Sequence, residues 1–447
     1  MSTRNSITRR DFVKAAAGLA VAGPLIITTP IRAVAGRAAP NDRIVMGFIG
    51  PGKQGFGHVR RLLRSNDVQV VAVCDVDTSR REFARKTVDE QYAKAKTGFK
   101  GCTAYKDFRE LLARDDINAV LIATPDHWHA IPVIVAAQAG KDIYCEKPLS
   151  LTIHEARQMA KAVRKNNVIF QTGSQQRTEF NGNFIKAVEY VRSGRIGKVT
   201  TVIVNTGGPS RDCNLPEEPV PDGLDWDFWL GPAPKRGYNK VLCPAGIPTK
   251  PTKEMGDVAW YDNYPNWRGY KDYSGGGMTD FGAHHFDIAQ WGLNMDNSGP
   301  VEIHPPDGKD YTRLTYKYAN GVVMYHTGGK ADVTFIGPGG KIEVSRGSIR
   351  SDPESILKEP LGSNDLHLNV NQGHHENWLS CIRSRKLPIA DVEAGCRSVT
   401  VCHLGNLAYW NKRALKWDPE KERFIGDDEA NTWLDRPKRA PWKLPEV

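Results

Sequence analysis

Residues 44–55 read IVMGFIGPGKQG, and this stretch decides how the N-terminal part of the chain folds. Its first six residues form an apolar run, which is typical of a buried strand in a parallel sheet. Glycines follow at positions 50, 52 and 55, and residues 54–63 have the apolar spacing of a helix. The stretch therefore predicts a strand, a tight turn and a helix in immediate succession.

Each of the three glycines has its own physical task in such a turn. Gly50 permits the sharp turn, Gly52 lets a phosphate approach the backbone, and Gly55 lets the helix pack closely on the strand. The helix N-terminus, which carries Lys53 and Gln54, then faces the negative charge. A G-x-G-x-x-G pattern between a strand and a helix predicts a site for the pyrophosphate of a nicotinamide dinucleotide.

The residue at the end of the next predicted strand indicates whether the cofactor is NAD or NADP. Asp75 lies 20 residues after Gly55. A carboxylate at this position accepts hydrogen bonds from the adenosine ribose and repels a 2′-phosphate, so we expect NAD as the cofactor. Arg80 and Arg81 lie close in sequence and keep NADP as the less favoured alternative.

Apolar runs and helical patterns alternate from here to about residue 170. This alternation predicts an α/β Rossmann domain over residues 41–170, with a doubly wound parallel sheet. From residue 171 the pattern changes to alternating strands joined by turns such as Asn320-Gly321. We expect residues 171–447 to form an α+β domain with a mostly antiparallel open sheet and a long loop insertion over residues 207–276.

Two polar segments follow later strands of the Rossmann pattern, where ligands of open α/β sheets bind. One contains Thr124, Pro125 and His129, and the other contains Glu146 and Lys147. We expect all five residues to contribute to the cofactor site. For His129, a buried core or capping histidine is an equal alternative.

The segment GGGMTDFGAH at positions 275–284 places an acid and a base four residues apart. On a helix, Asp280 and His284 would share one face. We expect His284 to accept a hydroxyl proton, and Lys147 to stabilise negative charge on the same oxygen. Asp280 would orient His284 or a sugar hydroxyl. His285 is the alternative base if the helix is rotated, and His374-His375-Glu376 is interpreted as a helix start.

Taken together, the fingerprint, the TPxxxH turn, the EKP turn and the GGxxxDxGxH segment resemble the Gfo/Idh/MocA oxidoreductase family, over essentially the whole chain after its N-terminal segment. The resemblance implies catalytic roles for Lys147, Asp280 and His284, a sugar, glycoside or cyclitol substrate, and a homodimer or homotetramer. Two alternatives come with it: a glycosidase that acts through transient sugar oxidation, and a non-catalytic dinucleotide or sugar sensor. Lys147 argues against the glycosidase, and Lys147, Asp280 and His284 together with an export signal argue against the sensor.

Residues 1–35 have the three parts of a twin-arginine signal peptide. Thr8-Arg9-Arg10-Asp11-Phe12 is followed by an apolar run and then by Ala33-Val34-Ala35, a small-residue cleavage site. We expect export by the twin-arginine translocase, a periplasmic or secreted location, and no membrane anchor after cleavage. Because free dinucleotide is scarce there, the cofactor would have to be held tightly.

Charge and cysteine usage exclude other classes of protein. The net charge is +10 without a dense basic block, so nucleic acid is not an expected partner. The eight cysteines show no metal-ligand spacing, so no metal is expected, and a Cys213–Cys243 disulfide stays open. The aromatic residues of the loop insertion favour a sugar platform and a satellite core or oligomer arm equally; they are Trp226, Trp229, Trp260, Trp267, Tyr261, Tyr264, Tyr270 and Tyr273.

Overall fold

The computed structural model describes residues 42–95, 99, 101–246, 265–330, 332–368, 370 and 372–447. The predicted signal peptide lies outside these residues, as do Trp260, Tyr261 and Tyr264 of the loop insertion. From Ile44 to Val447 the chain forms one compact unit that contains two β-sheets. No helix within the described ranges is long and apolar enough to cross a lipid bilayer.

The first sheet confirms the predicted doubly wound arrangement. It has six strands, and every neighbouring pair is parallel. From edge to edge the strands are β3 (Thr103–Tyr105), β2 (Val68–Cys74), β1 (Ile44–Ile49), β4 (Ala119–Ile122), β5 (Asp142–Cys145) and β6 (Phe170–Thr172). The order reverses between β1 and β4, and a ligand crevice forms beyond the carboxyl ends of the strands at such a point.

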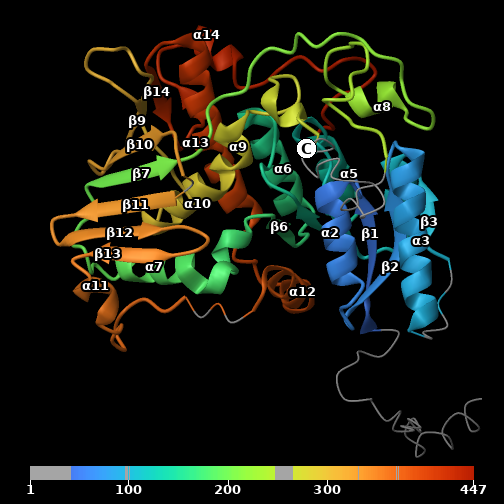
Figure 1. Ribbon diagram of the computed structural model, residues 1–447, viewed down its shortest axis with the longest axis horizontal. Coiled ribbons are helices and arrows are strands. Elements are labelled where there is room, and N and C mark those ends of the chain that lie inside the picture. Colours follow the sequence, from blue (N-terminus) through green and yellow to red (C-terminus); the bar gives the residue numbers. More distant parts are fainter. Residues whose placement is uncertain are drawn as a thin grey trace, which may run out of the picture. The chain divides into compact units, whose positions relative to one another are not determined.

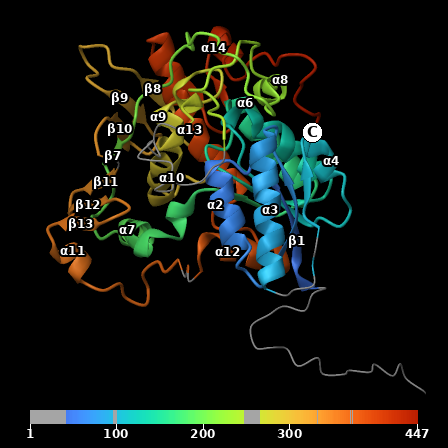
Figure 2. The same cartoon turned by 45° about the vertical axis from the view of Figure 1, so that its right-hand side comes forward.

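Helices cover both faces of this sheet (Figure 1, Figure 2). One face carries α2 (Lys53–Leu62), α3 (Thr78–Lys94) and α12 (His374–Ser384). The other carries α4 (Phe108–Leu112), α5 (Ala130–Gln138), α6 (Ile153–Lys165) and the first turns of α13 (Val392–Asn411). Trp378 of α12 and Val399 of α13 are buried in the two cores of this sheet. These two helices come from the predicted second domain and pack on the first sheet, a contact that an apolar helix face does not reveal in the sequence.

The second sheet has nine strands, and all neighbouring pairs are antiparallel except β7 and β10. In spatial order they are β13 (Ile349–Asp352), β12 (Gly340–Val344), β11 (Asp332–Gly337), β7 (Thr201–Asn205), β10 (Val323–Thr327), β9 (Leu314–Lys317), β8 (Glu302–His304), β14 (Leu415–Asp418) and β15 (Arg423–Phe424). The mostly antiparallel second sheet is thus confirmed.

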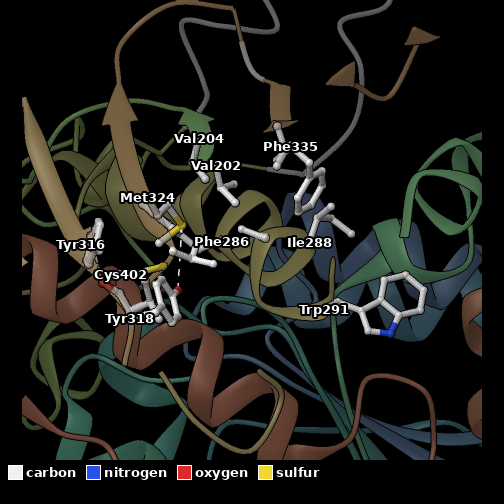
Figure 3. Packing of buried hydrophobic residues seen from close by; sticks show 14 of the residues in the cluster. Val202, Val204, Phe286, Ile288, Trp291, Tyr316, Tyr318, Met324, Phe335 and Cys402 are labelled. Carbon is white, nitrogen blue, oxygen red and sulfur yellow. Dashed lines mark hydrogen bonds between the residues drawn. The ribbon is translucent and has the colours of Figure 1, made fainter. Parts of the chain in front are cut away.

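One face of the second sheet is packed against α7 (Asn183–Arg192), α10 (Gly282–Gly292) and the later turns of α13. Figure 3 shows side chains of β7, β10 and α10, such as Val202, Met324 and Phe286, meeting in this core. Buried and half-buried residues alternate along β7, β10 and β11, as expected for a sheet with one covered face. The remaining short helices are α8 (Trp226–Leu230), α9 (Gly277–Asp280), α11 (Ser355–Lys358) and α14 (Asp428–Thr432).

Candidate active site

A cavity of about 810 Å³ opens at the carboxyl ends of β1, β2, β4 and β5, a volume suited to a small-molecule ligand. Its far wall comes from α9, α10 and the hairpin loop between β12 and β13. Eleven of the predicted site residues line it: Gly50, Gly52, Lys53, Gln54, Asp75, Thr124, Pro125, Glu146, Lys147, Asp280 and His284. The fold therefore brings both predicted motif groups to one cavity.

The glycine turn has the geometry that the sequence predicts. Gly50 has φ of +80°, and a Cβ there would lie 2.9 Å from the backbone of Ala123 and Thr124. A Cβ on Gly55 would lie 2.1 Å from the carbonyl oxygen of Gly50, so Gly55 closes the turn rather than lining the cavity. At Gly52 a Cβ would meet no atom of the described residues within 4 Å. The space beside Gly52 is thus open to a ligand.

The start of α2 suits a phosphate group. No side chain caps this helix end, and its first turn contains no acidic residue. A helix end of this kind is suited to an anion, because its first backbone N–H groups point out of the helix along its axis. Burial, with a smaller contribution from the charge of Arg268, lowers the pKa of Lys53 to about 8, so the side chain is cationic at neutral pH. These features fit a dinucleotide pyrophosphate.

Asp75 lines the part of the cavity where the adenosine of the dinucleotide is expected. Its carboxylate accepts the backbone N–H of Asp77 at 2.9 Å, and burial raises its pKa to about 6. Arg80 donates to the carbonyl oxygen of Pro244 at 2.5 Å, and Arg81 donates to the backbone carbonyl oxygen of Asp75 at 3.3 Å. Both arginines are engaged with protein groups, which fits NAD better than NADP.

Glu146 is the centre of a buried hydrogen-bond network. Its Oε1 lies 2.7 Å from Nε2 of His58 and accepts from Nε2 of Gln175 at 2.8 Å. Burial alone would raise its pKa, but the hydrogen bond and charge of His58 and the charge of Lys147 outweigh it and lower the pKa to about 2. The Nδ1 of His58 lies 2.8 Å from Nε2 of His375. Glu146 therefore fixes the turn that carries Lys147, although it also lines the cavity.

Lys147 and Asp280 form an ion pair at the far end of the cavity. The Nζ of Lys147 donates to Oδ1 of Asp280 at 2.5 Å and to its carbonyl oxygen at 2.8 Å. Burial opposes ionisation of Asp280, but the charges of Lys147 and Arg268 outweigh it and lower its pKa. No hydrogen bond joins Asp280 to His284 in the described residues. Asp280 thus orients Lys147 instead of His284, because an ammonium is a stronger partner for a carboxylate than a neutral imidazole.

His284 has the properties of a proton acceptor. Its Nδ1 is buried and has no hydrogen-bond partner among the described groups. Burial lowers its pKa well below the usual value, and the charges of Lys147 and Arg346 add to this effect, so the ring is neutral near pH 7. His285 is buried outside the cavity lining, with Nδ1 3.1 Å from the carbonyl oxygen of Asn205. The structure therefore supports His284 over His285.

His129 takes the alternative role that the sequence left open. Its Nδ1 lies 2.8 Å from the carbonyl oxygen of Pro148, and its Nε2 lies 2.9 Å from that of Thr124. The side chain is buried and is not part of the cavity lining. His129 joins the two loops that form the cavity wall and does not face the ligand space.

Sequence reasoning missed several residues of the cavity wall. His375 lies in the first turn of α12, at the predicted helix start. Its side chain also lines the cavity, and its Nε2 contacts Nδ1 of His58. Asp126 lies inside the TPxxxH turn, and burial raises its pKa to about 7. Arg346 arrives from the loop between β12 and β13. Of these three residues, only Asp126 lies within a motif that predicted the cofactor site, so only Asp126 could have been found from the sequence.

Those aromatic residues of the loop insertion that the structure describes mainly form a satellite core. Trp226, Trp229, Tyr238, Trp267, Tyr270 and Tyr273 are buried in one cluster. Trp229 and Trp267 also border the cavity. Cys213 and Cys243 are free thiols, so the disulfide that the sequence left open is not formed.

Two family models match successive parts of the chain. Residues 44–174 match an oxidoreductase family's NAD-binding Rossmann fold, and residues 255–444 match an oxidoreductase family's C-terminal alpha/beta domain. The chain belongs to the Gfo/Idh/MocA family. The Rossmann domain of this Gfo/Idh/MocA protein is accordingly an NAD-binding domain, as the glycine turn and Asp75 predict.

Curated relatives of this Gfo/Idh/MocA protein carry the name of a glycosidase family. A Glycosyl hydrolase family 109 protein from Shewanella pealeana is 32% identical over 211 residues, which is 43% of this chain and 44% of the relative. One from Shewanella baltica is 30% identical over 213 residues, 44% of this chain and 45% of the relative. The similarity thus spans less than half the length of these relatives.

Solved structures share the fold at low sequence identity. The aldose-aldose oxidoreductase from Caulobacter crescentus, complexed with glycerol, is 17% identical with a TM-score of 0.56, covering 84% of this chain and 99% of that one. The WlbA dehydrogenase from Bordetella pertussis, in complex with NADH and UDP-GlcNAcA, is 17% identical with a TM-score of 0.53, covering 84% and 99%. These likenesses show that the overall fold is shared.

Proposed function

We propose that this protein is an exported NAD-dependent oxidoreductase that transfers hydride between a hydroxyl group of a sugar, glycoside or cyclitol and a tightly bound nicotinamide cofactor. The observation that carries the proposal is the convergence of Lys147, Asp280 and His284 on the cavity that also contains the glycine turn. A dinucleotide site and a proton-handling site in one cavity are the two requirements for oxidising an alcohol.

The proposed roles follow from the contacts of the three side chains. Bound NAD supplies the hydride acceptor. His284 is neutral and buried, and its Nδ1 has no hydrogen-bond partner in the described part of the chain, so it accepts the hydroxyl proton. Lys147, held by Asp280 at 2.5 Å, donates a hydrogen bond to the same oxygen and stabilises the charge that develops there.

A glycoside hydrolase that acts through transient sugar oxidation is the second candidate. The name of the curated relatives favours it. In that reaction the hydride returns to the sugar, so a nitrophenyl glycoside would release nitrophenol in many turnovers without net reduction of the nucleotide. The proposed oxidoreductase would instead reduce its nucleotide stoichiometrically and stop until an electron acceptor is added.

The test begins with protein purified from the exported fraction. Denaturing it should release about one nicotinamide dinucleotide per chain, because a periplasmic enzyme must retain its cofactor. Incubation with a panel of sugars, glycosides and cyclitols should convert the bound nucleotide to its reduced form, measured by absorbance and fluorescence. Protein without nucleotide, from a culture in which it is exported, would contradict tight retention.

Two variants separate chemistry from binding. Lys147→Met should slow reduction of the nucleotide by about 10²- to 10³-fold per bound nucleotide, as expected when a stabilising donor is removed, with the rate normalised to the nucleotide that each preparation retains. Lys358→Met, an exposed lysine of α11 outside the cavity, is the matched control and should leave the rate unchanged. Unchanged reduction in Lys147→Met would contradict the proposed role.

A further inference from the structure

The guanidinium of Arg346 occupies an unusual place in the cavity wall. Arg346 lies in the loop between β12 and β13 and lines the cavity. Its guanidinium carbon lies 4.6 Å from the ring centre of Phe180 and 4.7 Å from that of Phe281, two other lining residues. Aromatic rings attract the cation by their faces, but they use none of its N–H donors. The two rings hold the group in place and leave its donors available.

Arg346 forms no ion pair with a carboxylate of the described residues. Its guanidinium makes no ion pair or hydrogen bond with any described residue, and its buried Nε has no partner. Three carboxylates of the cavity act on it through their charge, and each already has another partner. Asp280 binds Lys147 at 2.5 Å, Glu146 binds His58 at 2.7 Å and Glu179 binds Arg61 at 2.7 Å. Arg346 is therefore a surplus cation beside the proposed reaction centre.

A fully buried arginine, Arg177, shows how this chain satisfies a structural guanidinium. Arg177 also packs on an aromatic ring, that of Trp291 at 5.0 Å. It binds Asp287 with two hydrogen bonds of 2.7 and 2.9 Å, and Asp296 with two more of 2.7 and 2.9 Å. A buried arginine that serves the fold thus has its donors occupied, whereas Arg346 does not. The donors of Arg346 are available for a ligand.

The position of Arg346 indicates that this ligand belongs to the substrate and not to the cofactor. Its charge helps to lower the pKa of His284, the proposed base. The cofactor phosphates belong to the turn at Gly50 and Gly52, and Asp75 is not among the groups that act on Arg346. An anion held by Arg346 would therefore be part of the molecule that reacts beside His284.

We propose that Arg346 binds an oxyanion group of the substrate, so that the substrate class is acidic sugars bearing a carboxylate or a phosphate group. This inference rests on the proposed oxidoreductase function and specifies its substrate. The guanidinium offers a planar pair of N–H donors that matches two oxygens of such a group. The surplus positive charge of the cavity wall also compensates the charge that the substrate brings with it.

The experiment measures sugar binding to protein loaded with NADH, which cannot oxidise an alcohol, so that binding is observed without turnover. Glucuronate, galacturonate, glucose 6-phosphate, glucose and galactose are titrated by calorimetry. At least one acidic sugar should bind about tenfold more tightly than its neutral counterpart, as a desolvated charge pair predicts. Preference for the uronates identifies a carboxylate, and preference for glucose 6-phosphate identifies a phosphate.

Variants of Arg346 provide the decisive comparison. Arg346→Gln should lose the preference for the acidic sugar, and Arg346→Lys should keep part of it because the charge remains without the planar pair of donors. Arg350→Gln is the matched control, since Arg350 lies on the same hairpin, is exposed and is paired with Glu343. It should bind every sugar as the wild type does.

The outcomes separate this inference from the proposed function. Neutral and acidic sugars that bind the NADH-loaded protein equally well, and reduce the NAD-loaded protein equally well, in wild type and in Arg346→Gln, would overturn the inference and leave the oxidoreductase function standing. Loss of NADH retention in Arg346→Gln, with sugar preference intact, would place Arg346 in the cofactor site and also overturn it. No binding and no reduction with any sugar would contradict the proposed function itself.

Discussion

At the scale of single residues, carboxyl groups of one cavity are held in different protonation states by their partners. Glu146 has a pKa of about 2 because His58 binds and offsets its burial. Asp126 lines the same cavity and forms no ion pair within the described ranges, and burial raises its pKa to about 7. The ionised Glu146 suits a positioning role, whereas Asp126 exchanges a proton near neutral pH.

The first prediction concerns Asp75 and the choice of dinucleotide. Asp75→Ser removes the charge that repels a 2′-phosphate, so the ratio of NADP to NAD affinity should rise by about 10- to 100-fold. Dissociation constants measured by fluorescence titration on nucleotide-free protein test this. Asp116→Ser, an exposed acid outside the cavity, should leave the ratio unchanged. An unaltered ratio in Asp75→Ser would refute the role of Asp75.

The second prediction concerns the pH dependence of NAD binding. The pKa of Lys53 is about 8, so its side chain is charged below that pH and attracts the pyrophosphate, and it becomes neutral above it. NAD affinity should therefore fall as pH rises from 7 to 9, by up to about tenfold. Lys53→Met should bind more weakly at pH 7 and show a flatter profile. An equally steep profile in the variant would assign the effect to another group.

Some residues of the cavity could be predicted from the sequence, and others could not. His284 could be preferred over His285 because it is four residues from Asp280, a spacing that a helix turns into proximity. Arg346 and His375 reach the cavity from distant parts of the chain, and His58 and His375 are 317 residues apart. Local spacing carries no information about such contacts.

At the scale of elements, Glu146 joins three segments that meet only in the folded chain. It follows β5, His58 lies in α2, and His375 lies in α12. The strands and helices themselves were largely predictable, since apolar period and turn residues are local signals. The sequence did not predict which helix covers which sheet, because that choice depends on packing between distant segments.

The third prediction concerns this junction. The folded-state pKa of Glu146 lies below its ordinary value, so the ionised group adds stability above about pH 5 and loses it as pH falls toward 2. Glu146→Gln should lower the free energy of unfolding at pH 7 by about 3 kcal/mol, as for other broken buried pairs. Its stability should also fall less steeply between pH 5 and pH 3. Urea denaturation measures both effects.

The control for this variant lies nearby on α12. Glu376 pairs with Arg61 at 3.2 Å but is half exposed, so Glu376→Gln should cost less than about 1 kcal/mol. A loss of stability in Glu146→Gln no larger than in Glu376→Gln would show that the buried network does not stabilise the junction.

At the scale of the whole molecule, one face of the second sheet is left without a helical cover in the described residues. Ile203, Tyr325 and Thr334 lie in register on neighbouring strands and are half-buried on the face opposite the core. We propose that a second copy of the chain packs here, in a dimer or tetramer. A broad, partly apolar sheet face is suited to such an interface.

The fourth prediction tests this assembly. Light scattering coupled to gel filtration should give a mass of two or four chains for the wild type. Tyr325→Glu, which places a charge in the centre of this face, should reduce the mass to that of one chain. Leu387→Glu, at an exposed apolar position in the loop after α12, is the comparison variant and should keep the assembly. A monomeric wild type would refute the proposal.

The return of α12 to the first sheet has a consequence for synthesis. A ribosome that has made residues 42–172 has produced all six strands of that sheet, but Trp378 and His375 are still to come. Until they arrive, one core stays partly open and the Glu146 junction lacks its third member. Because His375 also lines the cavity, the wall of the cofactor cavity is complete only once synthesis has passed α12.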